Sequence, residues 1–152
     1  MRVEEIEAKS IYGVTTRTKN TNEMDPKTAK IAKVWQEFDA KVDVDYKGGE
    51  RVYGVYYDYE SDASGDFNVL AGYATVNEHL TSVTIEKGSY LVFSKSFEST
   101  DGQTRINAII STWGEIWNYF SDTDSEFKRA FITDFEYYKG ANEIEIYISI
   151  KA

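Results

Sequence analysis

The end of the chain, residues 133–152, places carboxylates among aromatic residues and isoleucines in a pattern that alternates like two β-strands. Glu136 follows Phe135 and precedes two tyrosines, and Glu145 comes two residues before Tyr147. An unpaired charge is costly to bury, so carboxylates within such strands need a compensating partner. Aromatic rings beside a carboxylate suit an organic cation, because the rings offer π-faces and the acid offers a counter-charge.

Few residues are available for other kinds of chemistry. The chain has no cysteine, which excludes disulfides, thiolate metal ligands and cysteine nucleophiles. The single histidine, His79, has no second histidine beside which it could form a zinc site, and the same lack argues against a Ser–His–Asp triad. Gly48 and Gly49 predict a turn rather than a phosphate loop, because no strand–glycine–helix context follows them. We therefore expect neither a metal site nor a cofactor.

Length and composition predict a folded protein with one domain spanning residues 1–152. Hydrophobic residues make up 41% of the chain and aromatic residues 15%, led by 12 tyrosines. The net charge of −9 repels phosphate backbones, so we expect no direct binding of nucleic acid and a preference for cationic partners. No apolar run approaches the roughly 18 residues of a membrane span, and the first residues carry no apolar signal segment. These features predict a cytoplasmic protein that does not enter membranes.

The chain contains an internal repeat, with halves at about 1–78 and 79–152. Two of the three tryptophans coincide when the sequence is shifted by 78 residues, which is improbable by chance. The identical pairs under this shift include Tyr12 and Tyr90, Val14 and Val92, Ile31 and Ile109, Trp35 and Trp113, Glu37 and Glu115, Arg51 and Arg129, and Tyr59 and Tyr137. We interpret the pattern as a duplication.

Each half predicts the same order of elements, strand–helix–strand–strand. The first half has strands at 9–18, 51–60 and 68–76 and a helix at 25–42, which Asp25 is expected to cap. The second has strands at 88–98, 129–138 and 143–151 and a helix at 104–120, with a short strand at 81–88 between the halves. The predicted fold class is α+β: duplicated βαββ units form one curved antiparallel sheet, with helices on the outer face and a ligand groove between the halves.

Alternation along the last strands separates an apolar face from a polar one. The residues expected to contact the helices are Ile144, Ile146, Ile148 and Ile150. Glu145 and Tyr147 point the other way. Glu136 and Tyr138 share one face of the preceding strand, and the simplest register joins them to that polar face, away from the helices.

The repeat supplies a second wall for the same face, from Tyr56, Asp58 and Tyr73 in the first half. Where two half-sheets meet, a face of tyrosines and acids predicts a groove for an organic cation. The alternative is that these side chains belong to an ordinary solvated sheet face.

The order of segments resembles the GyrI-like, or AraC-type, effector-binding domain superfamily. The resemblance rests on "VYGVYYDYESDASGDFNVLAGYAT", "IEKGSYLVFSKSFE", "TWGEIWNYF", "DFEYY" and "EIEIYISIK", and it covers essentially the whole chain. It implies a duplicated βαββ fold with a ligand groove between the halves. In multidrug-sensing activators of this type, the glutamate of the Phe-Glu-x-Tyr strand contacts lipophilic cations, and that position matches Glu136. The resemblance also implies that Glu145 and Tyr147 line the same pocket.

Two features depart from the family pattern. Ser149 stands where the last strand of the family usually runs into a proline. No DNA-binding helix-turn-helix accompanies the domain, so an effect on transcription would require a separate partner regulatory protein.

These observations predict a binding module for lipophilic cationic or aromatic small molecules, acting in sensing or sequestration. The candidate ligand-binding residues are Glu136, Glu145, Tyr147, Tyr138, Tyr56 and Tyr73. Trp35 and Trp113 lie in amphipathic helical stripes and are predicted to belong to the core. One alternative is a GyrI-like hydrolase that opens strained electrophilic compounds, with Glu136 and either Glu145 or Tyr147 as acid and base. Another is partner binding through an exposed sheet edge.

Overall fold

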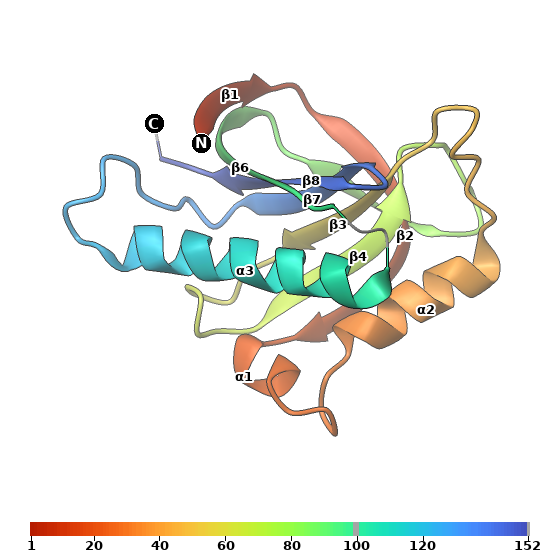
Figure 1. The fold of residues 1–152 in the computed structure, drawn as a ribbon, viewed down its shortest axis with the longest axis horizontal. Coiled ribbons are helices and arrows are strands. Elements are labelled where there is room, and N and C mark those ends of the chain that lie inside the picture. The colour runs from red at the N-terminus through yellow and green to blue at the C-terminus, as the bar shows by residue number, and fades with distance from the viewer. Residues whose placement is uncertain (99–100, 152) are drawn as a thin grey trace.

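Eight strands form one antiparallel sheet in the computed structural model, which describes residues 1–98 and 101–151 (Figure 1). None of the helices in these ranges has the length and apolar character that a membrane span requires. The elements in chain order are β1 (Arg2–Ile6), β2 (Lys9–Thr18), α1 (Asn20–Glu23), α2 (Ile31–Lys41), β3 (Val52–Tyr57), β4 (Phe67–Tyr73), β5 (Thr81–Ile85), β6 (Gly88–Ser96), α3 (Gly102–Ser121), β7 (Thr133–Gly140) and β8 (Glu143–Ser149).

The strand order is β1-β6-β8-β7-β3-β4-β2-β5, and the three main strands of each half follow the same order from the edge of the sheet to its centre. The second half contributes β6-β8-β7, the first contributes β3-β4-β2, and the two meet where β3 pairs with β7. Each half thus follows the expected order strand–helix–strand–strand. The short strand β5 adds to β2, whereas β1, which the sequence pattern did not predict, adds to β6. The expected α+β fold with one curved antiparallel sheet is confirmed.

Both long helices pack on the same face of the sheet (Figure 1). Ile116 of α3 contacts the isoleucines of β8, as alternation predicted. Phe38 of α2 packs against Val52 and Tyr73 of the first half. The apolar helix stripes and the apolar strand faces therefore bury one another, which is the main stabilising contribution of this layer.

The face away from the helices is a packed core, not an open groove. Side chains from β2 and β5 meet side chains from β6 and β8 there in one cluster, although β7, β3 and β4 lie between these two pairs of strands in the sheet, so the sheet curls around this face. Phe135 and Tyr147 stack with ring centroids 4.4 Å apart and an angle of 7°. The prediction of an open groove on this face is wrong, because curling brings the aromatic side chains together in a buried cluster.

Helix α2 begins at Ile31, later than predicted. Asp25 accepts a hydrogen bond from the Lys27 amide at 2.9 Å and forms a turn instead of the helix cap. The cap comes from Glu23 of α1, whose carboxylate accepts bonds from the amides of Lys30 at 2.9 Å and Ile31 at 3.1 Å. A carboxylate at a helix N-terminus satisfies free amides and interacts favourably with the helix dipole. The short helix α1 is thereby held against the start of α2.

Candidate ligand-binding site

A cavity of about 380 Å³ lies between α2 and α3, above the central strands β3 and β7. Tyr56, Glu136 and Tyr138 line it from the strands, while Trp35 and Trp113 line it from the two helices. The remaining lining residues are Asn20, Glu23, Ile31, Ala32, Tyr59, Ala63, Phe67, Ile106, Ile109, Ile110, Trp117 and Arg129. The cavity therefore lies at the junction of the two halves, on the helix-covered face.

The Glu136 carboxylate is fixed by three neutral donors. Its Oε2 atom accepts hydrogen bonds from the Tyr56 hydroxyl at 2.9 Å and from Trp113 Nε1 at 2.8 Å. Its Oε1 atom accepts one from the Tyr138 hydroxyl at 2.9 Å. Gly54 on the neighbouring strand leaves space for this group, since a Cβ atom at that position would lie 2.6 Å from Glu136 Oε1. The position of the carboxylate is thus set from three elements at once.

The charge of Glu136 has no cationic partner within the described residues. The side chain is only 3% exposed and forms no ion pair there. Burial raises the pKa of Glu136 above its usual value, although the hydrogen bonds from Trp113, Tyr56 and Tyr138 act in the opposite direction. Burial raises the pKa values of both tyrosines well above normal, so these groups remain protonated donors. An isolated buried carboxylate of this kind favours the arrival of a cation.

The raised pKa of Glu136 predicts a pH-dependent effect of Glu136→Gln on stability without ligand. The protonated form favours folding, so its contribution is complete below the unfolded pKa, about 4.3, and is lost as the pH rises through the higher folded pKa. We expect the variant to match the wild type in free energy of unfolding near pH 4 and to exceed it near about pH 8. Urea unfolding at both pH values measures the difference. The exposed Glu37→Gln variant should show no such change, and an equal difference at both pH values would contradict the prediction.

Aromatic rings form much of the wall around Glu136. Trp35 meets Tyr138 edge-on at 5.3 Å between centroids, and Tyr56 meets Trp113 at 5.1 Å. Apolar side chains of α3 also remain accessible to solvent at the cavity: Ile106, Ile110 and Trp117. Large apolar side chains gathered at an open cavity are typical of a binding site.

Arg129, which lines another part of the cavity, forms an ion pair with Asp134. The Nη2 atom of Arg129 lies 2.6 Å from Asp134 Oδ2, and Asp134 is fully buried. The hydroxyl of Tyr59 also donates to Asp134, and the Arg129 guanidinium lies over the Phe131 ring at 4.3 Å. The positive charge of Arg129 is therefore matched by Asp134 and does not neutralise Glu136.

The predicted site residues divide between the two faces of the sheet. Glu136, Tyr56 and Tyr138 come together in the cavity. Tyr73 shares their face but packs against Phe38 beneath α2, at 5.6 Å between ring centroids, and does not line the cavity. The predicted second-wall residue Asp58 lies just beyond β3, exposed and with a positive φ of 58°.

Glu145 and Tyr147 lie on the opposite face, because the strand register differs from the simplest one. Glu136 pairs with Ile146, and Tyr137 pairs with Glu145. Since directly paired residues point to the same face, the expectation that Glu136 and Glu145 share one is wrong. Neither Glu145 nor Tyr147 can act together with Glu136 as acid and base, because the sheet separates them.

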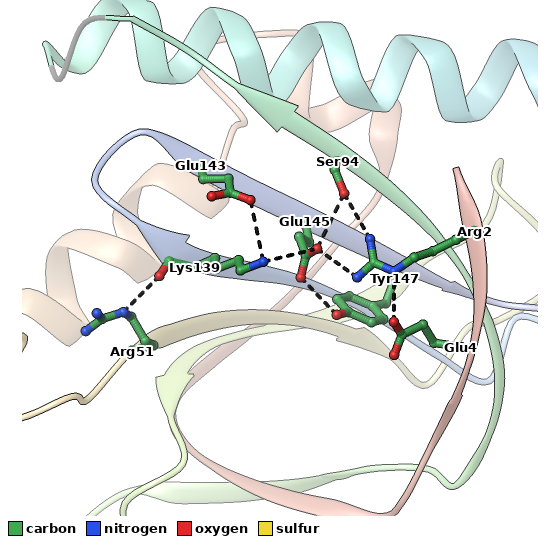
Figure 2. A network of polar contacts seen from close by, with 8 residues as sticks. All are labelled: Arg2, Glu4, Arg51, Ser94, Lys139, Glu143, Glu145 and Tyr147. Atoms are coloured by element: carbon green, nitrogen blue, oxygen red, sulfur yellow. Dashed lines mark hydrogen bonds and ion pairs between the residues drawn. The ribbon is translucent and has the colours of Figure 1, made fainter.

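Glu145 has its own cationic partners (Figure 2). Its carboxylate lies 2.8 Å from Arg2 Nη2 and accepts a hydrogen bond from the Tyr147 hydroxyl at 3.0 Å. Burial raises its pKa, but the hydrogen bonds from Arg2 and Tyr147 outweigh this, and the pKa is lowered overall. Despite the nearby acids, no group of three or more acidic or histidine side chains within residues 1–98 and 101–151 could hold a metal ion. The arrangement is that of a structural ion pair joining β1 to β8.

The sequence pattern missed the tryptophans as cavity residues. It assigned Trp35 and Trp113 to the core, yet the Nε1 atom of Trp113 holds Glu136. A signal was present in α3, where Ile106, Ile110, Trp113 and Trp117 recur at helical spacing. This stripe lies beside the one that carries Ile116, so α3 has more apolar surface than packing on the sheet requires.

Comparisons with known proteins agree with this architecture. VCH_CASS2, an integron cassette protein from the mobile metagenome of Vibrio cholerae, is 36% identical, with 99% of this chain and 95% of that chain covered and a TM-score of 0.83. SAV2435, solved with bound tetraphenylphosphonium, is 14% identical, and the match covers 99% of this chain and 93% of SAV2435 with a TM-score of 0.67. EcmrR, solved by cryo-EM in a complex with DNA, is 11% identical, and the match covers 99% of this chain and 56% of EcmrR with a TM-score of 0.50.

The last two likenesses show a shared fold. A comparison with curated proteins finds no match. The family model of integron-associated effector binding proteins, Cass2, matches residues 2–150, in agreement with the resemblance found in the sequence. The chain belongs to this family of effector binding proteins.

Proposed function

We propose that the protein binds a lipophilic organic cation in the cavity between α2 and α3, with Glu136 as the counter-charge. One observation carries the proposal: Glu136 is a buried carboxylate without a cationic partner in the described residues, and it faces a cavity walled by aromatic and aliphatic side chains. A cation that enters this space supplies the missing opposite charge in a desolvated setting, where attraction between charges is strong.

The walls suit a ligand with a large apolar body. The cavity volume of about 380 Å³ lies within the usual range for small-molecule sites, roughly 300–1,000 Å³. Trp35, Tyr56 and Trp113 offer ring faces and edges to an aromatic cation. The neighbour SAV2435, which shares the fold, was solved with tetraphenylphosphonium bound, and this supports the same class of ligand here.

Binding of this kind serves either to sense a compound or to sequester it. The net charge of −9 disfavours direct contact with a phosphate backbone. An effect on transcription would therefore act through a partner regulatory protein that itself contacts DNA.

Titration with tetraphenylphosphonium tests the role of Glu136. Tryptophan fluorescence reports binding directly, because Trp35 and Trp113 line the cavity. We expect Glu136→Gln to weaken binding at least tenfold, since it keeps the shape of the side chain but removes the charge. Hydrogen bonds and contacts to charged groups contribute about 1.5–3 kcal/mol, and each 1.4 kcal/mol corresponds to tenfold in affinity.

Two controls isolate the charge effect. Glu37→Gln removes an exposed carboxylate from α2 and is expected to leave the affinity unchanged. Triphenylphosphine oxide, a neutral compound of related shape, should bind the wild type and Glu136→Gln equally. If tetraphenylphosphonium binds Glu136→Gln as tightly as the wild type, Glu136 is not its counter-charge and the proposal fails.

A further inference from the structure

A second cavity, of about 430 Å³, lies on the other side of Tyr138. Tyr138 lines both cavities, but the second one is otherwise formed by different residues and does not include Glu136. Val52 and Phe97 give it apolar walls, and two arginines, Arg51 and Arg105, line it as well. Its charge is thus opposite in sign to that of the first cavity.

The Arg51 guanidinium is held in a fixed orientation by carbonyl groups. Its Nε atom donates to the carbonyl oxygen of Lys139 at 3.0 Å, as Figure 2 shows. Its Nη1 atom donates to the carbonyl oxygens of Tyr46 at 3.0 Å and Glu50 at 2.8 Å. Carbonyl oxygens carry no net charge, so they orient the guanidinium without neutralising it. The Nη2 atom of Arg51 forms no hydrogen bond with a described residue.

Arg105 approaches the same space from α3. Burial and the charge of Asp39 raise the pKa of Tyr46 overall, although the charges of Arg105 and Arg51 act in the opposite direction. Tyr46 also lines the cavity, whereas Asp39 does not. Arg51, Arg105 and Tyr46 therefore line one cavity.

These two arginines lack the carboxylate partners that the other arginines have. Arg2, Arg17 and Arg129 each form an ion pair with an aspartate or glutamate. Within the described residues, neither Arg51 nor Arg105 lies within ion-pair distance of one. In a chain with 26 acidic and 17 basic residues, two such arginines at one cavity are unexpected.

The internal repeat explains why Arg51 has no partner. Arg51 corresponds to Arg129 under the 78-residue shift, and the acid that pairs with Arg129, Asp134, corresponds to Tyr56. The first half therefore carries the arginine without its carboxylate. A guanidinium that is oriented but not neutralised is suited to an external oxyanion, which it can bind through two parallel hydrogen bonds.

We propose that this second cavity binds a small organic anion, with its carboxylate or phosphate group between Arg51 and Arg105 and its apolar body against Val52, Phe97 and Tyr138. The inference does not depend on cation binding at Glu136, because the two sites share only Tyr138 and select opposite charges. Benzoate is the simplest probe that has both parts, and phenyl phosphate and inorganic phosphate distinguish the kind of oxyanion and the need for an apolar body.

Calorimetric titration with benzoate tests the proposal. We expect saturable binding that Arg105→Gln weakens at least tenfold and that Arg105→Lys partly restores, because lysine keeps the charge but not the planar fork. Arg105 is exposed, so its loss should not disturb folding, whereas Arg51→Gln also removes three bonds to carbonyls. Lys87→Gln removes one positive charge from an exposed side chain elsewhere and should leave benzoate affinity unchanged.

Three results would overturn the proposal: no saturable binding of benzoate or phenyl phosphate, equal binding to wild type and Arg105→Gln, or equal binding of the neutral analogue benzamide. Tighter binding of benzoate than of phenyl phosphate assigns the site to carboxylates, and the reverse order assigns it to phosphates. Glu136→Gln should leave benzoate affinity within twofold of the wild type. Benzoate binding at the second cavity can therefore be tested independently of cation binding at Glu136.

Discussion

Replacing Asp134 with alanine is expected to lower the free energy of unfolding by about 3–5 kcal/mol, the usual cost of removing one partner from a buried ion pair. Asp134 is fully buried and lies 2.6 Å from Arg129 Nη2. Its carboxylate also accepts hydrogen bonds from the Tyr59 hydroxyl and from the amide and the hydroxyl of Ser149. The substitution leaves a nearly buried guanidinium without its counter-charge and three donors without their acceptor.

Urea unfolding monitored by circular dichroism measures this loss. The double variant Arg129→Met/Asp134→Leu removes both charges and is expected to be more stable than Asp134→Ala, because no unpaired charge remains. A loss below about 1 kcal/mol for Asp134→Ala, the range of an exposed pair, would mean that water reaches the ion pair.

Gly54→Ala is expected to weaken binding of tetraphenylphosphonium by roughly ten- to a hundredfold while leaving the Glu136 charge in place. The new Cβ atom would lie 2.6 Å from Glu136 Oε1 and 3.2 Å from Trp35 Cζ2. The carboxylate must move, and it then loses the hydrogen bond from Tyr138. Losing a buried hydrogen bond costs about 1–3 kcal/mol, which corresponds to this range of affinity.

Gly114→Ala is the matched control for this change. Gly114 lies within α3, and a Cβ atom there meets nothing within 4 Å. Alanine in a helix interior is favoured over glycine by roughly 0.5–1 kcal/mol, so this variant should be slightly more stable with unchanged affinity. Fluorescence titration of both variants gives the comparison. Unchanged affinity in Gly54→Ala would show that the exact position of the Glu136 carboxylate does not matter for the cation.

The two cavities together give the molecule adjoining sites of opposite charge. Tyr138 donates its hydroxyl to Glu136 and also lines the cavity of Arg51 and Arg105. A ligand bound in either cavity would therefore lie beside a residue that also lines the other. Any coupling between a bound cation and a bound anion would act through this side chain.

Most of the fold could be predicted from the sequence. The repeat indicated two strand–helix–strand–strand units, and the alternation of Ile144, Ile146 and Ile148 identified the face that contacts α3. These signals are local, since they depend on the period of each element and on burial of its apolar side. The start of α2 was less predictable, because its cap comes from Glu23 and not from the nearby Asp25.

The site was predictable only in part. The sequence pattern singled out Glu136, Tyr56 and Tyr138, which line the cavity, but it placed them on the same face as Glu145 and Tyr147. Acids in alternating strands usually lie on the polar face of a sheet. The structure instead buries Glu136 on the helix face, where Tyr56, Tyr138 and Trp113 satisfy its oxygens.

The sequence by itself determined the order of the elements, the apolar faces of helices and strands, and the presence of acids among tyrosines. Only the tertiary structure decided which acid has a cationic partner. A shift of one residue in register moves a side chain to the other face, and alternation alone cannot detect it. The pairing of Glu136 with Ile146 directs its carboxylate toward the helices, where the described residues offer no cation. Glu145 faces the other way and meets Arg2, 143 residues away in the chain, because β1 and β8 both pair with β6.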